Sequence, residues 1–198
     1  MSGIIFIFFL WGVWIVATFL LNKDDPARLP IAALSLLLLV VSSISFSVNS
    51  VTVNGAAILL MMGSCVVISK WSFLQKMYFI FSALTIMVGY AGAYLLELYD
   101  SVWVLIDKRI LLSSALYIIG WILYPASLFY RFFSIVVGTL LGEIFLGMFL
   151  SQWSMPYTVG SLEYLDIFGL SATLLLIAHL LTAFKRIMKQ YATQRVMH

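Results

Sequence analysis

A glutamate inside a hydrophobic stretch is the residue of this sequence best placed to do chemistry. Glu143 lies in GTLLGEIFLGMFL, near the middle of an apolar segment at residues 132–150. A carboxyl group at that depth of a membrane is costly unless it is protonated, paired or in contact with water. Thr139 and Gly147 lie four residues to either side of Glu143, so the three share a helix face that we expect to point toward other helices. The position fits either a proton or cation site, or a neutral acid hydrogen-bonded to a hydroxyl of a neighbouring helix. We favour the second reading.

A second polar candidate is His179, in the apolar segment at residues 165–184. Imidazole can relay protons or bind metal, but a lone histidine is more typical of a hydrogen-bonded position within a helix bundle. Glu143 and His179 fall at different depths of their segments, so we expect no direct pair. Glu143, His179 and Thr139 are therefore the candidate intramembrane polar residues. The single cysteine, Cys65, and the two histidines form no cluster, and we predict neither a metal site nor a cofactor.

Small residues at helical spacing predict where helices approach one another closely. Gly138 and Gly142 form a GxxxG pattern just before Glu143, and the pattern favours a packing seam within the monomer over a dimer motif. We expect the same role for three further glycines: Gly147, and Gly89 and Gly92 of VGYAGAY.

Sequence motifs of known enzyme classes are missing from the chain. It contains no nucleophile elbow, zinc-protease HExxH, P-loop or dinucleotide-binding glycine motif. The last apolar segment has no lysine for a retinal Schiff base, and no aspartate pair lies inside an apolar segment. We therefore predict a protein without enzyme activity of its own.

Composition places these residues in a membrane. Of 198 residues, 64% are hydrophobic and only 10% are charged, whereas soluble domains carry about 25% charged residues. The net charge of +3 sits beside apolar segments, so it indicates membrane orientation and not nucleic-acid binding. We predict an all-α polytopic bundle forming a single transmembrane domain over 1–198. Its spans are expected at about 3–21, 30–48, 55–69, 77–96, 110–130, 132–150 and 165–184, followed by a basic cytoplasmic tail at 185–198.

The distribution of Lys and Arg predicts the orientation of the seven spans. With the N-terminus outside and the C-terminus cytoplasmic, nine of the eleven basic residues face inward, and only Lys108 and Arg109 lie outside. Omitting the short third span would reverse this bias. The outer face is then expected to carry a group of acidic residues: Glu97, Asp100, Asp107, Glu163 and Asp166. It is also expected to carry an aromatic belt: Trp103, Trp153, Tyr157 and Tyr164.

The layout of the chain resembles a known family. The aromatic opening FFLWGVWIVATFLL, the polar break NKDDPARLP and the tightly connected spans are similar to the small YphA-type membrane proteins of Bacillus and its relatives. The resemblance covers the whole chain and implies the plasma membrane of a Gram-positive bacterium, with a role in sporulation or the cell envelope. It carries over no catalytic residue.

Two functions remain open at this point. The first is a structural or accessory protein of the cell envelope, whose partners are the lipid bilayer and a membrane-protein partner or a second copy of the chain. The second is a small-solute or proton-coupled transporter or channel that uses Glu143. A cavity reaching Glu143 favours transport, and a filled bundle favours the accessory role.

Overall fold

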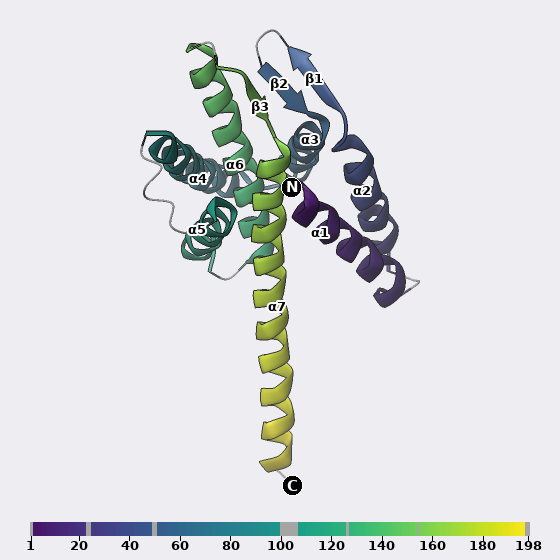
Figure 1. Cartoon of the computed structure of the whole chain (residues 1–198). Coiled ribbons are helices and arrows are strands. Elements are labelled where there is room, and N and C mark those ends of the chain that lie inside the picture. Colours follow the sequence, from purple (N-terminus) through teal and green to yellow (C-terminus); the bar gives the residue numbers. More distant parts are fainter. Residues whose placement is uncertain are drawn as a thin grey trace.

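The computed structural model describes residues 2–22, 25–48, 51–99, 107–125, 127–153 and 155–196. Within these ranges the chain forms a helical bundle with a small sheet at one end (Figure 1). The helices are α1 (Ile4–Ile15) with a π-helical turn η1 (Val16–Leu20), α2 (Arg28–Val41), α3 (Gly55–Ser69), α4 (Phe73–Tyr99), α5 (Lys108–Leu123), α6 (Leu128–Ser151) and α7 (Leu162–Val196). The strands are β1 (Ser45–Val48), β2 (Val51–Asn54) and β3 (Tyr157–Val159).

The prediction of a helical bundle is confirmed. The prediction that the chain contains only helices is wrong, because three short segments form a sheet. The second span was expected to continue to residue 48, but α2 ends at Val41 and Ser45–Val48 is strand β1. Polar and apolar residues alternate along this strand, which fits a pleated element better than a helix. β1 pairs antiparallel with β2, and β3 joins β2 in parallel, with Val53 opposite Val159.

Two further predicted boundaries shift in the structure. The fifth span was expected to run from residue 110 to residue 130, but α5 ends at Leu123 and Leu128 begins α6. Pro125 lies in the break, where it lacks the backbone N–H that would continue a helix. The basic tail predicted at 185–198 is a helical extension of the last span in the described part of the chain, because α7 continues without interruption to Val196.

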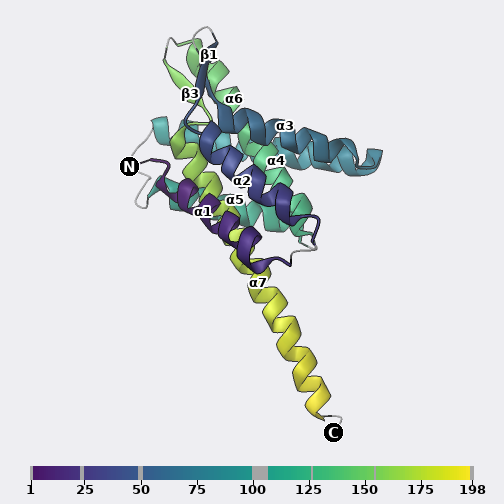
Figure 2. The same cartoon turned by 90° about the vertical axis from the view of Figure 1, so that its right-hand side faces the viewer.

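By length and composition, three of the described helices can cross a membrane: α4, α6 and the first part of α7, Leu162–Thr182. The helical stretches Ile4–Leu20, Arg28–Val41 and Gly55–Ser69 are apolar but shorter. The second half of α7 extends well beyond the rest of the bundle (Figure 2). In Figure 1, α4 and α5 are seen nearly end-on while α7 runs along the page, so these helices cross α7 steeply.

The turns between helices gather at two ends of the bundle. The sheet end holds strands β1–β3, the start of α1, and the starts of α5 and α7, where a backbone N–H of Gly3 meets Asp166. At the opposite end Arg28 donates to the carbonyl of Thr18, and the ring of Trp71 packs edge-on against Tyr130. Successive helices therefore run from one end to the other and back.

The interface between α4 and α6 is the centre of the structure. Buried residues spaced by four on α4, Ser82, Ile86 and Tyr90, face Ser134, Gly138 and Gly142 on α6 in a constant register. A Cβ added at Gly138 would lie 2.7 Å from Cβ of Ile86 and 2.9 Å from the carbonyl oxygen of Ala83. One added at Gly142 would lie 2.8 Å from Cδ1 of Tyr90. The constant register shows that the two helices run in the same direction where they pack, and glycine allows their close approach.

The other glycines highlighted by the sequence have different environments. Gly147 is buried on α6, and a Cβ at Gly89 would meet Ile119 of α5 at 3.7 Å, an ordinary contact. Gly92 does not belong to the expected seam, because a Cβ there would have no heavy atom within 4 Å. Its position is exposed, so it lies on the outward side of α4.

Candidate functional site

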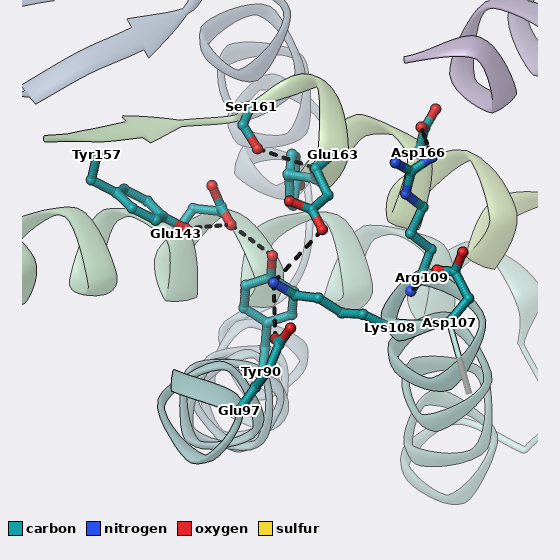
Figure 3. A network of polar contacts seen from close by, with 11 residues as sticks. Tyr90, Glu97, Asp107, Lys108, Arg109, Glu143, Tyr157, Ser161, Glu163 and Asp166 are labelled. Atoms are coloured by element: carbon teal, nitrogen blue, oxygen red, sulfur yellow. Dashed lines mark hydrogen bonds and ion pairs between the residues drawn. The ribbon is translucent and has the colours of Figure 1, made fainter. Parts of the chain in front are cut away.

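The carboxyl group of Glu143 lies in the interior of the bundle, with a relative exposure of 1%. Tyr90 of α4 donates its hydroxyl to Oε1 at 2.6 Å, and Tyr157 of β3 donates to the same oxygen at 3.0 Å. The backbone N–H of Gly160 donates to Oε2 at 2.9 Å. The carboxyl group therefore ties α6 to α4 and to the connection between α6 and α7 (Figure 3).

Gly160 can supply its N–H because of its backbone conformation. Its φ is +71°, in the left-handed region that side chains disfavour. A Cβ at this position would also lie 2.4 Å from Cβ of Ala57, inside the van der Waals contact distance. Glycine is thus needed both for the turn that leads from β3 into α7 and for the approach of α3.

Thr139 and Tyr164 extend the site along α6. The Thr139 hydroxyl lies 2.7 Å from the carbonyl of Ile135, to which it donates, and 3.1 Å from the Tyr164 hydroxyl. The ring of Tyr164 packs edge-on against Tyr90 at a centroid distance of 6.3 Å. The expected shared face of Thr139 and Glu143 is thus occupied by two buried tyrosines. We call the residues Glu143, Tyr90, Tyr157, Gly160, Thr139 and Tyr164 the Glu143 cluster.

The burial of Tyr157 and Tyr164 corrects the predicted aromatic belt. Tyr164 is fully buried and Tyr157 is partly buried, with its hydroxyl pointing to Glu143 instead of toward a membrane surface (Figure 3). Burial and the neighbouring Glu143 raise the pKa of the Tyr157 phenol, so this side chain remains a neutral hydrogen-bond donor. Trp153 is exposed, and Trp103 lies outside the described residues.

Ion pairs surround the Glu143 cluster at the sheet end. The Lys108 ammonium lies 2.9 Å from Glu97 and 3.7 Å from Glu163. It also sits 3.9 Å from the ring centroid of Tyr94, which packs edge-on against Tyr157. A short series of contacts therefore joins a partly exposed charge group to the buried acid.

Asp166 forms a separate buried junction. Its carboxylate accepts hydrogen bonds from the backbone N–H groups of Gly3, at 2.7 Å, and Phe6, at 3.1 Å. Arg109 of α5 pairs with the same carboxylate at 2.8 Å. Asp166 thus satisfies N–H groups at the start of α1 that the helix itself leaves unbonded. The described acidic residues of the predicted outer group lie at the sheet end, and of these Asp166 is buried. Asp100, the other member of that group, lies outside the described residues.

A second polar group occupies the α4–α6 interface toward the opposite end. Ser134 donates to Ser82 at 3.0 Å, and Ser82 lies 3.2 Å from the Tyr124 hydroxyl. The Arg131 guanidinium donates to the carbonyls of Tyr124, at 2.7 and 3.1 Å, and Pro125, at 3.0 Å. We call Ser82, Ser134, Tyr124 and Arg131 the Ser82 cluster. Ile86, packed on Gly138, separates it from the Glu143 cluster.

His179 is not part of either cluster. Its side chain is exposed on α7, beyond the region where α7 packs against the bundle, and its carbonyl accepts the Thr182 hydroxyl at 2.8 Å. The expectation that it does not pair with Glu143 agrees with this placement. Among the described residues, no three His, Cys, Asp or Glu side chains gather in a metal-binding arrangement.

The fold and its polar junctions define the class of protein: a multi-pass integral membrane protein, in which buried polar side chains bond to one another inside a helical bundle. The chain belongs to the YphA-like integral membrane protein family, whose model matches residues 2–197. This confirms the resemblance seen in the sequence. The comparisons with curated proteins and with solved structures gave no match.

Proposed function

We propose that this chain is a non-enzymatic structural or accessory protein of the cell envelope, in which Glu143 is an internal anchor. The observation that carries the proposal is that Glu143 accepts three hydrogen bonds, from α4, from β3 and from the turn before α7, all within the protein. Three apolar cavities among the described residues are lined by side chains other than Glu143. An acid engaged in this way stabilises an architecture and is poorly placed to exchange ligands.

The proposal includes a seven-span topology with the N-terminus outside and the C-terminus in the cytoplasm. The sorting of the turns into two ends supports it, because the sheet end then carries Lys108 and Arg109 and the opposite end carries most of the other basic residues. The proposal also includes the plasma membrane of a Gram-positive bacterium and a role in sporulation or the cell envelope. A membrane-protein partner or a second copy is the expected contact.

Labelling of single cysteines in intact cells tests this topology. In a Cys65→Ala background, an impermeant thiol reagent should label Asp107→Cys and leave Lys189→Cys unlabelled until the cells are opened. The opposite pattern would reverse the orientation. Labelling of both positions in intact cells would rule out the arrangement of the last three spans.

Proton-coupled transport through Glu143 is the alternative function. The contacts from Lys108 through Tyr94 and Tyr157 to Glu143 favour it, since they link a partly exposed charge group to a buried acid.

A flux measurement separates the two functions. Purified protein is reconstituted into vesicles carrying a proton gradient, and the decay of the gradient is followed with a pH-sensitive dye. We expect vesicles with wild-type protein and with Glu143→Gln to lose the gradient at the rate of empty vesicles. Asp25→Asn, outside the contacts from Lys108 to Glu143, is the control for loss of an acid. Rapid decay with wild type and Asp25→Asn, abolished in folded Glu143→Gln, would replace the accessory role by transport.

A further inference from the structure

One feature that the Glu143 anchor does not explain is an apolar cleft between α6 and the first three helices. It has a volume of about 350 Å³ and lies between α1, α2 and α3 on one side and α6 and α7 on the other. Its walls are almost entirely apolar side chains such as Phe9, Leu38, Phe132 and Phe168. Pockets of this size are at the lower end of those that hold small ligands, roughly 300–1,000 Å³.

The two hydroxyl groups in the walls are already engaged. Ser35 donates to the carbonyl of Ala32 at 2.9 Å, and Ser64 donates to the carbonyl of Leu60 at 2.7 Å. The cleft therefore offers a ligand no free hydroxyl proton. An apolar cavity of this kind excludes water and binds apolar molecules.

The cleft is reached from the side, between α2 and α3. A second hollow of about 400 Å³ between these helices shares Leu34, Leu59 and Gly63 with the cleft. Its outer wall includes Met62 and Val66, which are exposed. In an integral membrane protein this side faces the hydrocarbon layer, so the molecules that can enter are those dissolved in the bilayer.

Positive charge marks one end of the cleft. Ile31 and Val67 line the cleft near the opposite end of the bundle. Arg28 and Lys70 lie three residues beyond them, about 4.5 Å further along each helix. In the described part of the chain neither cation enters an ion pair. The sequence has no Asp or Glu from residue 26 to residue 96, so the charge of Lys70 is not offset locally.

We propose that this cleft binds one acyl chain of an anionic phospholipid, whose phosphate lies between Arg28 and Lys70. The apolar walls and the lateral opening select a lipid chain, and the two cations select an anionic headgroup. Under this proposal the α2–α3 hairpin packs against the rest of the bundle partly through the bound lipid. The inference is independent of the role of Glu143.

Native mass spectrometry of the purified full-length protein, supplied with equal amounts of phosphatidylglycerol and phosphatidylcholine, tests the chain site. The decisive variant is Gly63→Leu, because a Cβ at Gly63 has no heavy atom within 4 Å and the added side chain enters the open space between α2 and α3. The matched control is Gly12→Leu on α1, which has the same free space but does not line the cleft. Helical circular dichroism and a single gel-filtration peak establish that each variant is folded.

We expect the wild type and Gly12→Leu to retain phosphatidylglycerol, and Gly63→Leu to retain at least tenfold less, equivalent to about 1.4 kcal/mol. Equal lipid retention by folded Gly63→Leu and Gly12→Leu would overturn the proposal. Wild-type protein that carries only detergent, or equal amounts of both lipids, would overturn it as well.

The headgroup part is tested by the double variant Arg28→Gln/Lys70→Gln. Glutamine removes the charge of Arg28 and is too short to reach the carbonyl of Thr18, to which the Arg28 Nη2 donates, so circular dichroism must show that this variant is folded. We expect lipid to remain bound but the preference for phosphatidylglycerol to fall by roughly tenfold. Lys185→Gln, an exposed cation further along α7, serves as the control. An equal loss of preference in Lys185→Gln would show that diffuse surface charge, and not this site, selects the lipid.

Discussion

The Glu143 cluster and the Ser82 cluster share one helix interface but are built from different kinds of contact. In the Glu143 cluster, the acid on α6 is bonded by groups from α4, β3 and the turn before α7. In the Ser82 cluster, Ser82 donates to the carbonyl of Phe79 on its own helix, and Arg131 donates to carbonyls six and seven residues away. All three donors to Glu143 belong to other elements than its own helix, whereas the Ser82 cluster combines two bonds between helices with several bonds to nearby backbone carbonyls.

This difference has an energetic consequence. A contact between elements that are far apart in sequence stabilises tertiary structure, whereas a bond to a carbonyl of the same turn is available in any state that keeps the helix. We therefore expect substitutions in the Glu143 cluster to lower the free energy of unfolding more than matched substitutions in the Ser82 cluster. The predictions below test this ranking.

The largest effect is expected for Glu143→Ala. It leaves Tyr90, Tyr157 and the N–H of Gly160 without their acceptor, and an unsatisfied buried group costs about 1–3 kcal/mol. Because the phenols can rotate toward other partners, we expect a total loss of roughly 2–4 kcal/mol. Glu143→Gln retains an acceptor oxygen and should lose less than half as much. Denaturant unfolding in detergent micelles measures both, and equal stability of Glu143→Ala and wild type would remove the anchor role.

The next largest loss of stability is expected for Gly138→Ala, at the position on α6 that lies between the two clusters. Gly138→Ala places a Cβ 2.7 Å from Cβ of Ile86, so α4 and α6 must move apart. Overpacking of this kind costs about 1–3 kcal/mol. Gly92→Ala on α4 is the control, since its Cβ meets nothing within 4 Å. It should be neutral or slightly stabilising, by up to about 1 kcal/mol from helix propensity. Similar unfolding midpoints for the two variants would show that the interface is not tightly packed.

The parts of this interface that could be predicted from sequence are those with local signals. Glu143 is the only acid near the middle of an apolar segment, and Gly138 and Gly142 have a spacing that predicts close packing. The partners of Glu143 could not be placed in the same way, because Tyr157 and Gly160 reach it through a turn whose geometry depends on β3 pairing with β2, over 100 residues earlier in the chain. The sequence signal for these partners was weaker than the signal for Glu143 itself. A buried acid needs hydrogen-bond donors, and the segment at residues 157–164 contains two tyrosines and a glycine.

The sheet was missed for a related reason. Ser45–Val48 continues an apolar run, so hydropathy extends the preceding helix through it, although the alternation of Ser with Phe and Val is a strand pattern. The burial of Asp166 was likewise not visible, since its partners Gly3 and Arg109 come from distant segments. Hydropathy located the seven α-helices of the described residues. The polar contacts that join these helices to distant segments could be seen only in the structure.

Arg131→Gln is expected to have an intermediate effect. The guanidinium holds the carbonyls of Tyr124 and Pro125, at the break between α5 and α6. Hydrogen bonds to charged groups contribute about 1.5–3 kcal/mol, but glutamine can keep one of them, so we expect a loss of about 1–2 kcal/mol. Thermal unfolding followed by circular dichroism measures it. A loss larger than that of Glu143→Ala would invert the ranking of the two clusters.

Tyr157→Phe removes one donor from Glu143 and should cost about 1 kcal/mol. It also changes the dependence of stability on pH. The pKa of Tyr157 is raised in the folded protein above its unfolded value of 10.0. Its neutral form is therefore favoured on folding, a contribution that is fully present below about pH 10 and is lost as pH rises above that value. Wild type should lose stability above this pH more steeply than Tyr157→Phe, and parallel pH profiles would contradict the assignment.

The smallest effect is expected for Ser134→Ala, which is the matched test in the Ser82 cluster. The substitution removes a hydroxyl that donates to Ser82, yet Ser82 still donates to the carbonyl of Phe79 at 2.8 Å and still lies beside Tyr124. No buried donor is left without a partner, and hydrogen bonds between helices in membranes contribute on average only about 0.6 kcal/mol. Alanine also favours the helix, which offsets part of that loss. Ser134→Ala should therefore unfold within about 0.5 kcal/mol of wild type in the same micelles that reveal the loss in Tyr157→Phe. If the two single-hydroxyl deletions had equal effects, a hydrogen bond to the buried acid would contribute no more to stability than a hydrogen bond between two serine hydroxyls.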